Sequence, residues 1–353
     1  MLMPQSIPKR LAPDHLAEQL RPFDTWPKDG SLPDGFFQSP VLAEAAAFHR
    51  ENGYVVLHAA LSNSETEALR IETSRLCRND NGLIDGIEPA SIGTSDTGAM
   101  TRVLCVHFPH KLSELINRTL SHSSITDILK LVIGPNVKCM QSMLFVKAAG
   151  KPGQAWHQDE DFIPTRDRSL TGAWISLDDA TIKNGCLWVL PKSHQRGVLW
   201  PQRVHFDNRF DCTHESWSFP WNDADSVPIE VKAGSIVLFN GYLLHRSLPN
   251  TSHRSFRRAL VGHYMSAESL LPWMKPDERT SMALADYRDI VMVAGEDPYA
   301  YKGIEDVAKA FVRPDVQGGC VDWNDDEQKK KAAEHARAIA EVKEQCAGST
   351  QAK

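Results

Sequence analysis

The stretch KCMQSMLFVKAAGKPGQAWHQD, residues 138–159, decides how this chain folds and where its chemistry lies. Its first part, residues 138–146, is an apolar run bounded by turn residues, which predicts a β-strand. A loop with two glycines and a proline follows at 150–153, and the stretch ends with His157, a glutamine and Asp159. Because alternate residues of an extended segment share a face, we expect the imidazole and the carboxylate to point the same way.

The chain beyond this stretch continues with the same pattern of short apolar segments and turns. Short apolar runs alternate with loops rich in Gly, Pro and Asn, and we interpret the runs as strands at 171–177, 186–190, 235–239 and 257–264. Many short strands with such turns predict an antiparallel barrel or a double-sheet jelly roll. Upstream, the pattern predicts helices at 41–48, 62–77, 111–120 and 124–133 and a strand at 53–57. A mainly β protein with preceding helices is therefore expected.

Differences in composition divide the chain into three parts. Residues 1–38 are rich in proline and polar side chains and predict an irregular N-terminal arm. Residues 39–320 are expected to form a single catalytic domain. Within it, the segment 191–228 shows no clear period, and a long segment of this kind in a compact domain is typical of a lid-like insertion. Residues 321–353 are rich in Asp, Glu, Lys and Ala and predict a charged helical tail.

The gross composition limits the class of protein. The chain has 353 residues, with 42% hydrophobic and 24% charged residues, which is typical of a globular protein with a sizeable core. A net charge of −6 argues against nucleic acid or an anionic membrane as a main partner. No apolar run approaches the roughly 20 residues of a membrane span. We also expect a small-molecule substrate and a monomeric or homodimeric state.

The ends and the cysteines predict a cytoplasmic location. The N-terminus has no long apolar stretch of the secretory type, and the last three residues, Gln-Ala-Lys, do not form a peroxisomal address. The cysteine count is odd at seven, and no pair has the CxxC spacing. A disulfide scaffold or a zinc cluster is thus not expected, and a reducing compartment is the default.

The pair formed by residues 157 and 159 needs context, because a His-x-acid pair is common in a chain with 14 histidines and 45 acidic residues. Two further pairs exist, His49-x-Glu51 and His205-x-Asp207. The first lies in a predicted helix, where residues two apart do not share a face. The second lies in the irregular insertion without a preceding strand. Only the pair at 157 and 159 follows a predicted strand and loop.

A second histidine and an arginine complete the pattern. His245 comes 88 residues after His157, behind an apolar strand and an Asn-Gly turn, and Arg257 follows 12 residues later. Two imidazoles and a carboxylate are the facial triad that holds non-haem Fe(II) and leaves other positions open. A guanidinium binds a carboxylate through two hydrogen bonds, which suits a dicarboxylate co-substrate such as 2-oxoglutarate. The alternatives are a core histidine at 245 and a surface arginine at 257.

The order and spacing of several motifs resemble the phytanoyl-CoA dioxygenase family of Fe(II)/2-oxoglutarate oxygenases, over roughly residues 42–265. The matching text is WHQD at 156–159, TGAWISLDDA at 171–180, NGCLWVLPKSH at 184–194, HRS at 245–247 and RRA at 257–259. The resemblance implies a cupin-like double-stranded β-helix, a jelly-roll variant, with helices packed on one sheet. It also implies Fe(2+) as cofactor, 2-oxoglutarate and O2 as co-substrates, and release of succinate and CO2.

Residue roles follow from the same resemblance. His157, Asp159 and His245 correspond to the iron ligands. Arg257 corresponds to the arginine that binds the distal carboxylate of 2-oxoglutarate, with Arg258 as the alternative. The further co-substrate contacts that the resemblance implies are Ser247, Trp174, Gln158, Gln141 and Arg102.

Two features of the matching text bear on the reaction. Phe145 stands where ectoine hydroxylase has an asparagine, so the co-substrate pocket is expected to differ there. Halogenating relatives replace the carboxylate ligand with a small residue. The intact Asp159 therefore favours hydroxylation, or a related oxidation, of an unactivated C–H bond.

The substrate and two rival functions remain open at this level. Trp200, Trp217 and Trp221 of the insertion are expected either to wall an apolar or amphipathic substrate or to pin the insertion to the core. One rival function is a cupin-like metal enzyme that does not use 2-oxoglutarate. The other is a non-catalytic β-sandwich binding protein. The pair of Arg257 and Ser247 counts against the first rival, which would have no dicarboxylate to hold. The intact triad and the intact arginine count against the second.

Overall fold

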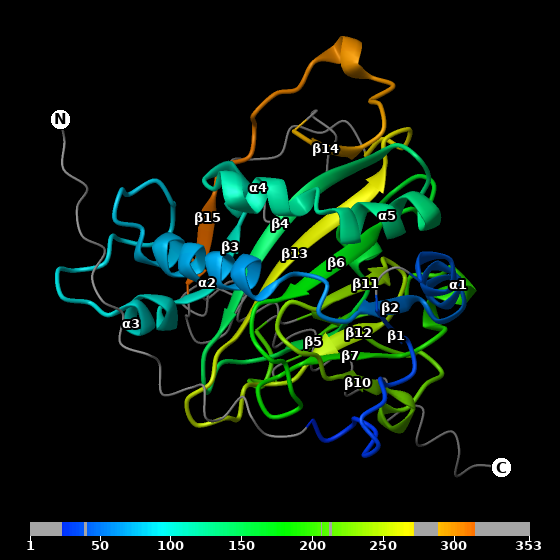
Figure 1. The fold of residues 1–353 in the computed structure, drawn as a ribbon, viewed down its shortest axis with the longest axis horizontal. Helices are drawn as coiled ribbons and strands as arrows, with labels where there is room; N and C mark the ends of the chain where they lie inside the picture. Colours follow the sequence, from blue (N-terminus) through cyan, green and yellow to red (C-terminus); the bar gives the residue numbers. More distant parts are fainter. Residues whose placement is uncertain (1–22, 39–40, 206, 212–213, 272–288, 315–353) are drawn as a thin grey trace, which may run out of the picture.

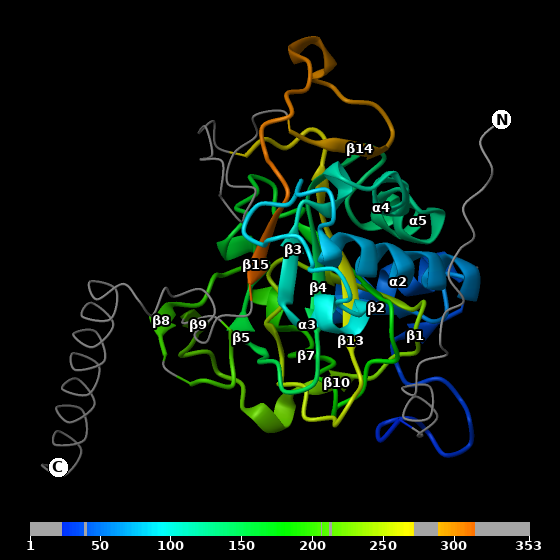
Figure 2. The same cartoon turned by 90° about the vertical axis from the view of Figure 1, so that its left-hand side faces the viewer.

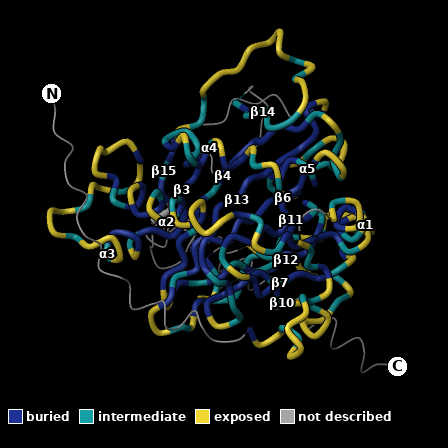
Figure 3. Tube along the Cα trace, in the orientation of Figure 1, coloured by how far each residue is buried: buried dark blue, intermediate teal, exposed yellow. Residues whose placement is uncertain are grey.

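Two β-sheets form the centre of the protein, and helices cover the outer face of the larger one (Figures 1 and 2). The strands are largely buried, whereas the outward faces of the helices and many loops are exposed (Figure 3). This arrangement confirms the predicted double-stranded β-helix with helices on one sheet. The computed structural model describes residues 23–38, 41–205, 207–211, 214–271 and 289–314.

The large sheet is built around its two longest strands. Its order is β1 (Phe36–Phe37), β2 (Tyr54–Leu57), β11 (Ile236–Asn240), β6 (Thr171–Ser176), β13 (Arg257–Ser266), β4 (Val137–Lys147), β3 (Val103–His107) and β15 (Phe311–Pro314), with β14 (Val291–Ala294) also paired to β4. All its pairings are antiparallel except the one between β1 and β2. All ten residues of β13 are buried, so this strand has a core on each side.

The small sheet faces the large one and carries the chemistry. Its order is β10 (Val227–Ile229), β7 (Leu187–Val189), β12 (His245–Ser247) and β5 (Gln154–His157). A separate hairpin is formed by β8 (Gln202–Val204) and β9 (His214–Ser216). Figure 2 shows this hairpin beyond β5, at the edge of the small sheet.

The α-helices lie in the first part of the chain and alternate there with β1, β2 and β3. They are α1 (Leu42–Asn52), α2 (Asn63–Arg78), α3 (Asp96–Thr101), α4 (Glu114–Leu120) and α5 (Ser123–Val132). Short 3-10 helices are η2 (Pro109–Lys111), η3 (Asp159–Asp161), η4 (Ser193–Arg196), η5 (Asp223–Asp225) and η6 (Ala300–Lys302). A capping box starts α2, because the Ser62 side chain accepts from Glu65 N while the Glu65 carboxylate accepts from Ser62 N.

Strand β13 separates two hydrophobic cores because its alternate residues face opposite sides. Leu260 belongs to the core beneath the helices, while Ala259 and Val261 pack in the core between the two sheets. At the start of the strand, Arg257 pairs with Lys147 of β4. Directly paired residues share a face of the sheet, so both charged side chains lie on the side that faces the small sheet.

One predicted helix is shorter than the sequence indicated. The expected helix at 111–120 is divided, because residues 109–111 form η2 and α4 begins only at Glu114. The reason is a local cap: Ser113 Oγ accepts a hydrogen bond from Ile116 N at 3.2 Å.

The segment 191–228 also differs from its prediction. It is not irregular throughout, since the β8–β9 hairpin lies within it and strand β10 begins at its end. Three-residue strands are too short to give a periodic signal. In the described part of the predicted N-terminal arm, residues 36–37 form β1 at the edge of the large sheet, and Trp26 Nε1 donates a hydrogen bond to Glu230 O at 3.0 Å. The predicted tail 321–353 lies outside the described residues.

Two further observations concern the described part of the chain. None of its helices is long and apolar enough to cross a membrane. Its cysteines, Cys77, Cys105, Cys139 and Cys186, are buried and form no disulfide.

Candidate metal centre and co-substrate pocket

Three potential metal ligands meet at the end of two neighbouring strands. His157 ends β5 and His245 begins β12, and the two residues are paired across the strands. Asp159 begins η3, and its Oδ1 lies 3.6 Å from Nε2 of each histidine. The three ligand atoms all lie within 4.8 Å of one another, and within the described ranges this is the one group of this kind.

Backbone carbonyls orient both imidazoles. His157 Nδ1 lies 2.8 Å from Ala155 O, and His245 Nδ1 lies 3.0 Å from Leu243 O. A carbonyl can only accept, so each Nδ1 carries a hydrogen, and in the neutral tautomer each Nε2 has a lone pair for a metal. This arrangement fits a metal ion held by two neutral imidazole nitrogens.

The ionisation states agree with metal binding. Burial lowers the pKa of His157 to about 4, and His245 acts in the same direction, so His157 is neutral at pH 7. Burial raises the pKa of Asp159, but His245 and His263 lower it by more, and its pKa lies below the ordinary range. Two imidazoles with one ionised carboxylate are the ligand set of non-haem Fe(II).

The other two His-x-acid pairs do not form such a site. His49 is buried in α1, while Glu51 is exposed on another side of the same helix. His205 Nδ1 accepts a hydrogen bond from Asp207 N, and the Asp207 carboxylate is paired with Arg209 at 2.6 Å. The pair that strand context selected in the sequence is thus the one that lies beside His245.

The structure distinguishes Arg257 from Arg258. Arg258 points to the helix side and forms two hydrogen bonds with the Asp178 carboxylate, at 2.8 and 2.6 Å. Arg257 is only 3% exposed, and its guanidinium carbon lies 5.6 Å from the centre of the Trp174 ring. It makes no hydrogen bond or ion pair with any residue that the structure describes. A buried guanidinium in this state is suited to receive an anion.

Ser247 lies on the same face of β12 as the ligand His245. Its Oγ accepts hydrogen bonds from Lys147 Nζ at 2.9 Å and from Gln154 N at 3.3 Å. With both lone pairs engaged, the hydroxyl proton is left to donate. A serine held in this way and an unpartnered arginine are suitable donors for one carboxylate.

Sequence reasoning did not assign Lys147 to this pocket. Its ammonium group is buried, donates to Leu248 O at 2.7 Å as well as to Ser247, and lies on the same face as Arg257. Burial lowers the pKa of Lys147 well below its usual value, and the nearby guanidinium of Arg257 adds to this. Only the register of β4 against β13 reveals this neighbour, and a single sequence does not contain that register.

The remaining predicted co-substrate contacts divide into two groups. Trp174 and Gln141 are buried on the inner face, and Gln141 pairs across the strands with His263. Gln158 does not face the pocket through its amide, which bonds to backbone groups of Val198, Tyr242 and Trp200. Its predicted place in the pocket wall therefore gains no support.

Arg102 lies at the end of α3 on the way into β3. It donates a hydrogen bond to Glu88 O at 3.3 Å. Its Nε and Nη2 are buried without a hydrogen-bond partner in the described part of the chain. The role of Arg102 as a co-substrate contact stays a prediction.

Comparison with known proteins identifies the family. The profile of the Phytanoyl-CoA dioxygenase (PhyH) family matches residues 49–259. The chain belongs to this family. Its site is thus the HxD…H facial triad of an Fe/2-oxoglutarate-dependent oxygenase, with iron as cofactor and 2-oxoglutarate as co-substrate.

Curated relatives carry the same family name. The chain is 34% identical over 170 residues to "Phytanoyl-CoA dioxygenase" of Arabidopsis thaliana, which covers 48% of this chain and 58% of that protein. It is 29% identical over 279 residues to "Phytanoyl-CoA dioxygenase 1" of Oryza sativa subsp. japonica, which covers 70% of this chain and 94% of that protein.

Solved structures share the fold. EctD from S. alaskensis in its apoform matches with a TM-score of 0.53 and 22% identity, covering 72% of this chain and 88% of that one. The epimerase SnoN in complex with Fe3+, alpha ketoglutarate and nogalamycin RO matches with a TM-score of 0.53 and 19% identity, covering 71% and 98%. These likenesses confirm the double-stranded β-helix of this family member.

The insertion covers the back of the metal centre. Trp200 and Trp221 pack with Trp156, Leu190 and Leu244 in a hydrophobic cluster on the outer face of the small sheet. These two tryptophans therefore pin the insertion to the sheet, as the second interpretation of the sequence expected, and they do not wall the triad.

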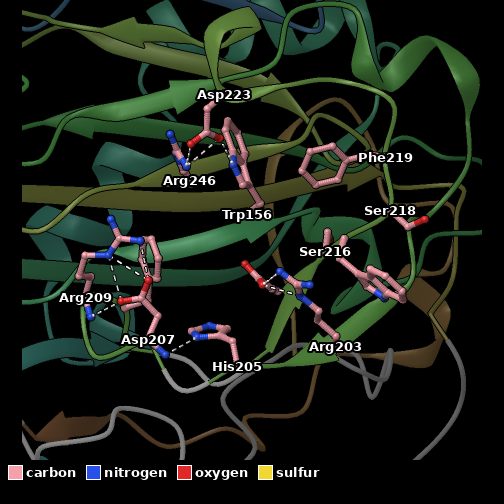
Figure 4. A pocket seen from close by; sticks show the side chains of 13 residues that line it. Trp156, Arg203, His205, Asp207, Arg209, Ser216, Ser218, Phe219, Asp223 and Arg246 are labelled. Carbon is pink, nitrogen blue, oxygen red and sulfur yellow. Dashed lines mark hydrogen bonds and ion pairs between the residues drawn. The ribbon is translucent and has the colours of Figure 1, made fainter. Parts of the chain in front are cut away.

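A cavity of about 520 Å³ lies on this same outer face, between the sheet and the β8–β9 hairpin (Figure 4). Its walls include Trp156 and Arg246, the chain neighbours of His157 and His245. Because neighbouring residues of a strand point to opposite faces, the small sheet separates this cavity from the triad. Its arginines are already paired with acids, as Arg246 is with Asp223. The cavity is therefore distinct from the metal centre.

Proposed function

We propose that this PhyH-family oxygenase hydroxylates an unactivated C–H bond of a small apolar or amphipathic molecule, and that Arg257 and Ser247 hold the distal carboxylate of 2-oxoglutarate. The observation that carries the proposal is the buried Arg257 guanidinium without a hydrogen bond or ion pair among the described residues. A charge in this position is costly in the ligand-free protein, and a bound carboxylate would satisfy it.

A short path of contacts connects this arginine to the triad. Ser247 lies two residues beyond His245, on the same face of β12. Lys147 joins Ser247 through its 2.9 Å hydrogen bond and pairs with Arg257 across the sheet. A dicarboxylate can therefore place one end against Arg257 and Ser247 and direct its keto acid end toward the triad.

The residues of the chain have distinct tasks in this reaction. When bound, iron with 2-oxoglutarate and O2 supplies an oxidation that yields succinate, CO2 and one oxygen atom for the substrate C–H bond. His157, Asp159 and His245 hold the cofactor on one face, and Arg257 and Ser247 orient the co-substrate. The intact Asp159 favours hydroxylation over halogenation, because a carboxylate fills the ligand position that a halide needs.

The surroundings of the triad support an apolar substrate. The Phe162 ring lies 6.2 Å from the His157 ring. On the inner face of β4, Met143 and Phe145 pack at the edge of the core between the sheets. These apolar side chains offer contacts to an apolar or amphipathic body.

The proposal is tested by substrate-dependent turnover. The purified protein, supplied with Fe(II) and 2-oxoglutarate, is screened against small molecules for succinate formation and O2 uptake. Products are then examined by mass spectrometry in 18O2. We expect the gain of one labelled oxygen atom with apolar or amphipathic compounds. A halogenated product, or an oxidation without oxygen transfer, contradicts hydroxylation. The absence of 2-oxoglutarate-dependent O2 uptake despite bound metal contradicts the co-substrate assignment.

Location and assembly are also proposals. We propose a cytoplasmic protein that is a monomer or a homodimer, although two mammalian relatives are named peroxisomal. Light scattering after size-exclusion chromatography gives the oligomeric state, and a fluorescent fusion in the native cell gives the location.

A further inference from the structure

His263 on β13 touches the acidic metal ligand. Its Nε2 lies 3.1 Å from Oδ2 of Asp159, and both side chains are buried. The other oxygen of the same carboxylate, Oδ1, lies 3.6 Å from Nε2 of His157 and of His245. The two oxygens of Asp159 therefore have different neighbours, and only Oδ1 faces the other ligands.

The chemistry of this contact fixes the proton on His263. An ionised carboxylate accepts hydrogen bonds and has none to donate, so Nε2 of His263 must carry the hydrogen. The hydrogen bond from His263 restrains Oδ2 of Asp159. Without this bond, the carboxylate could rotate and present both of its oxygens to the metal.

The surrounding strands hold the imidazole in place. His263 stands at a β-bulge, where the pairing of β13 with β4 shifts register, and a bulge re-aims the side chain beside it. Its partner on β6 is Gly172, where the Phe239 ring fills the position that a Cβ would take. On the other side its partner on β4 is the buried Gln141.

We propose that His263 is a positioning residue that restrains Oδ2 of Asp159, so that the carboxylate binds the metal through Oδ1 alone and the positions opposite the triad stay open. The inference concerns the metal centre of the family member and does not depend on the substrate class proposed above. Partners behind metal ligands of this kind typically change metal affinity by about 10- to 100-fold when they are removed.

Three variants test the hydrogen bond itself. His263→Leu removes the donor and keeps an apolar side chain of moderate size. His263→Gln keeps an N–H at a similar reach from the backbone, whereas His263→Asn is too short to reach Oδ2. Tyr264→Phe is the matched control, because it removes a buried hydrogen bond to Leu120 O from the next residue of β13, on the helix side of the sheet.

The readouts are the dissociation constant of Co(II) and its visible absorption spectrum in the protein without 2-oxoglutarate, which need no knowledge of the substrate. We expect the Leu and Asn variants to bind Co(II) about 10- to 100-fold more weakly with an altered spectrum. The Gln variant and the control should resemble the wild type.

Wild-type affinity and spectrum in the Leu and Asn variants overturn the proposal. Equal defects in the Gln and Leu variants also overturn it, because they show that ring packing matters and the hydrogen bond does not. If the Leu variant does not fold, the comparison of Gln with Asn decides.

Discussion

Replacing Arg257 and Arg258 by methionine, one at a time, should produce opposite kinds of damage. The two side chains are neighbours in sequence and both are buried. Among the residues that the structure describes, only Arg258 is hydrogen-bonded to an acid, Asp178, at 2.8 and 2.6 Å. Methionine keeps much of the side-chain length and removes the charge. The two variants therefore distinguish an arginine that binds a ligand from an arginine that stabilises the fold.

The magnitudes follow from these partners. Losing one partner of a buried, hydrogen-bonded charge pair costs about 2–5 kcal/mol. Arg257→Met should therefore raise the dissociation constant of a 2-oxoglutarate mimic by roughly 30-fold to 4,000-fold. The same change removes an unsatisfied buried charge, so the unfolding free energy of the ligand-free protein should stay level or rise.

Arg258→Met should instead destabilise the fold. It leaves the buried Asp178 carboxylate without its main partner, which typically costs about 3–5 kcal/mol of unfolding free energy. Arg70 remains 3.5 Å from Asp178 Oδ1 and compensates in part, so the lower end of this range is expected. Binding of the co-substrate mimic should change little under conditions in which the variant is folded.

The assay combines two measurements on each variant. Isothermal titration of the Mn(II)-loaded protein with N-oxalylglycine gives the affinity, and urea unfolding without ligand gives the stability. If Arg258→Met loses N-oxalylglycine binding at unchanged stability while Arg257→Met binds normally, the assignment of the two faces of β13 is wrong.

Three further outcomes are expected. Asp159→Ala should lose bound iron and succinate formation, as metal analysis and a succinate assay will show, and wild-type turnover in this variant contradicts the ligand assignment. Ser62→Ala should lower the unfolding free energy by about 1 kcal/mol through loss of the α2 capping box, whereas Ser64→Ala should not, as urea unfolding can check. Burial lowers the pKa of Lys147 in the folded protein, so the unfolded chain binds more protons between the lowered pKa and the usual one. The unfolding free energy of the wild type relative to Lys147→Met should therefore increase as pH rises through the alkaline range, and a flat difference contradicts this.

Local features could be predicted from the sequence because their causes lie close together in the chain. The alternation of side chains along an extended segment was enough to predict that His157 and Asp159 share a face. The spacing of Ser62 and Glu65 indicated the start of α2. The strands β5 and β12 were not recognised as such, since runs of three or four residues are shorter than any reliable period.

Contacts between distant segments could not be predicted in the same way. The partner that assigns Arg258 to the fold is Asp178, 80 residues away, and the contact of His263 with Asp159 spans 104 residues. Composition likewise indicated that the tryptophans of the insertion are important, but it could not tell which face of the small sheet they cover. These facts depend on strand order and register, which a single sequence does not display.

The small sheet is a single layer of strands with the metal ligands on one side and the insertion on the other, and this arrangement limits how the sequence of the insertion can evolve. On one side stand His157 and His245; on the other, their chain neighbours Trp156 and Arg246 both reach Asp223, at 3.2 and 3.1 Å (Figure 4). Changes in the 191–228 insertion therefore act on β5 and β12, the same two strands that position the iron-binding histidines. Sequence change in the insertion is therefore constrained by the geometry of the metal ligands, and a foreign insertion grafted here should be tested first for iron retention.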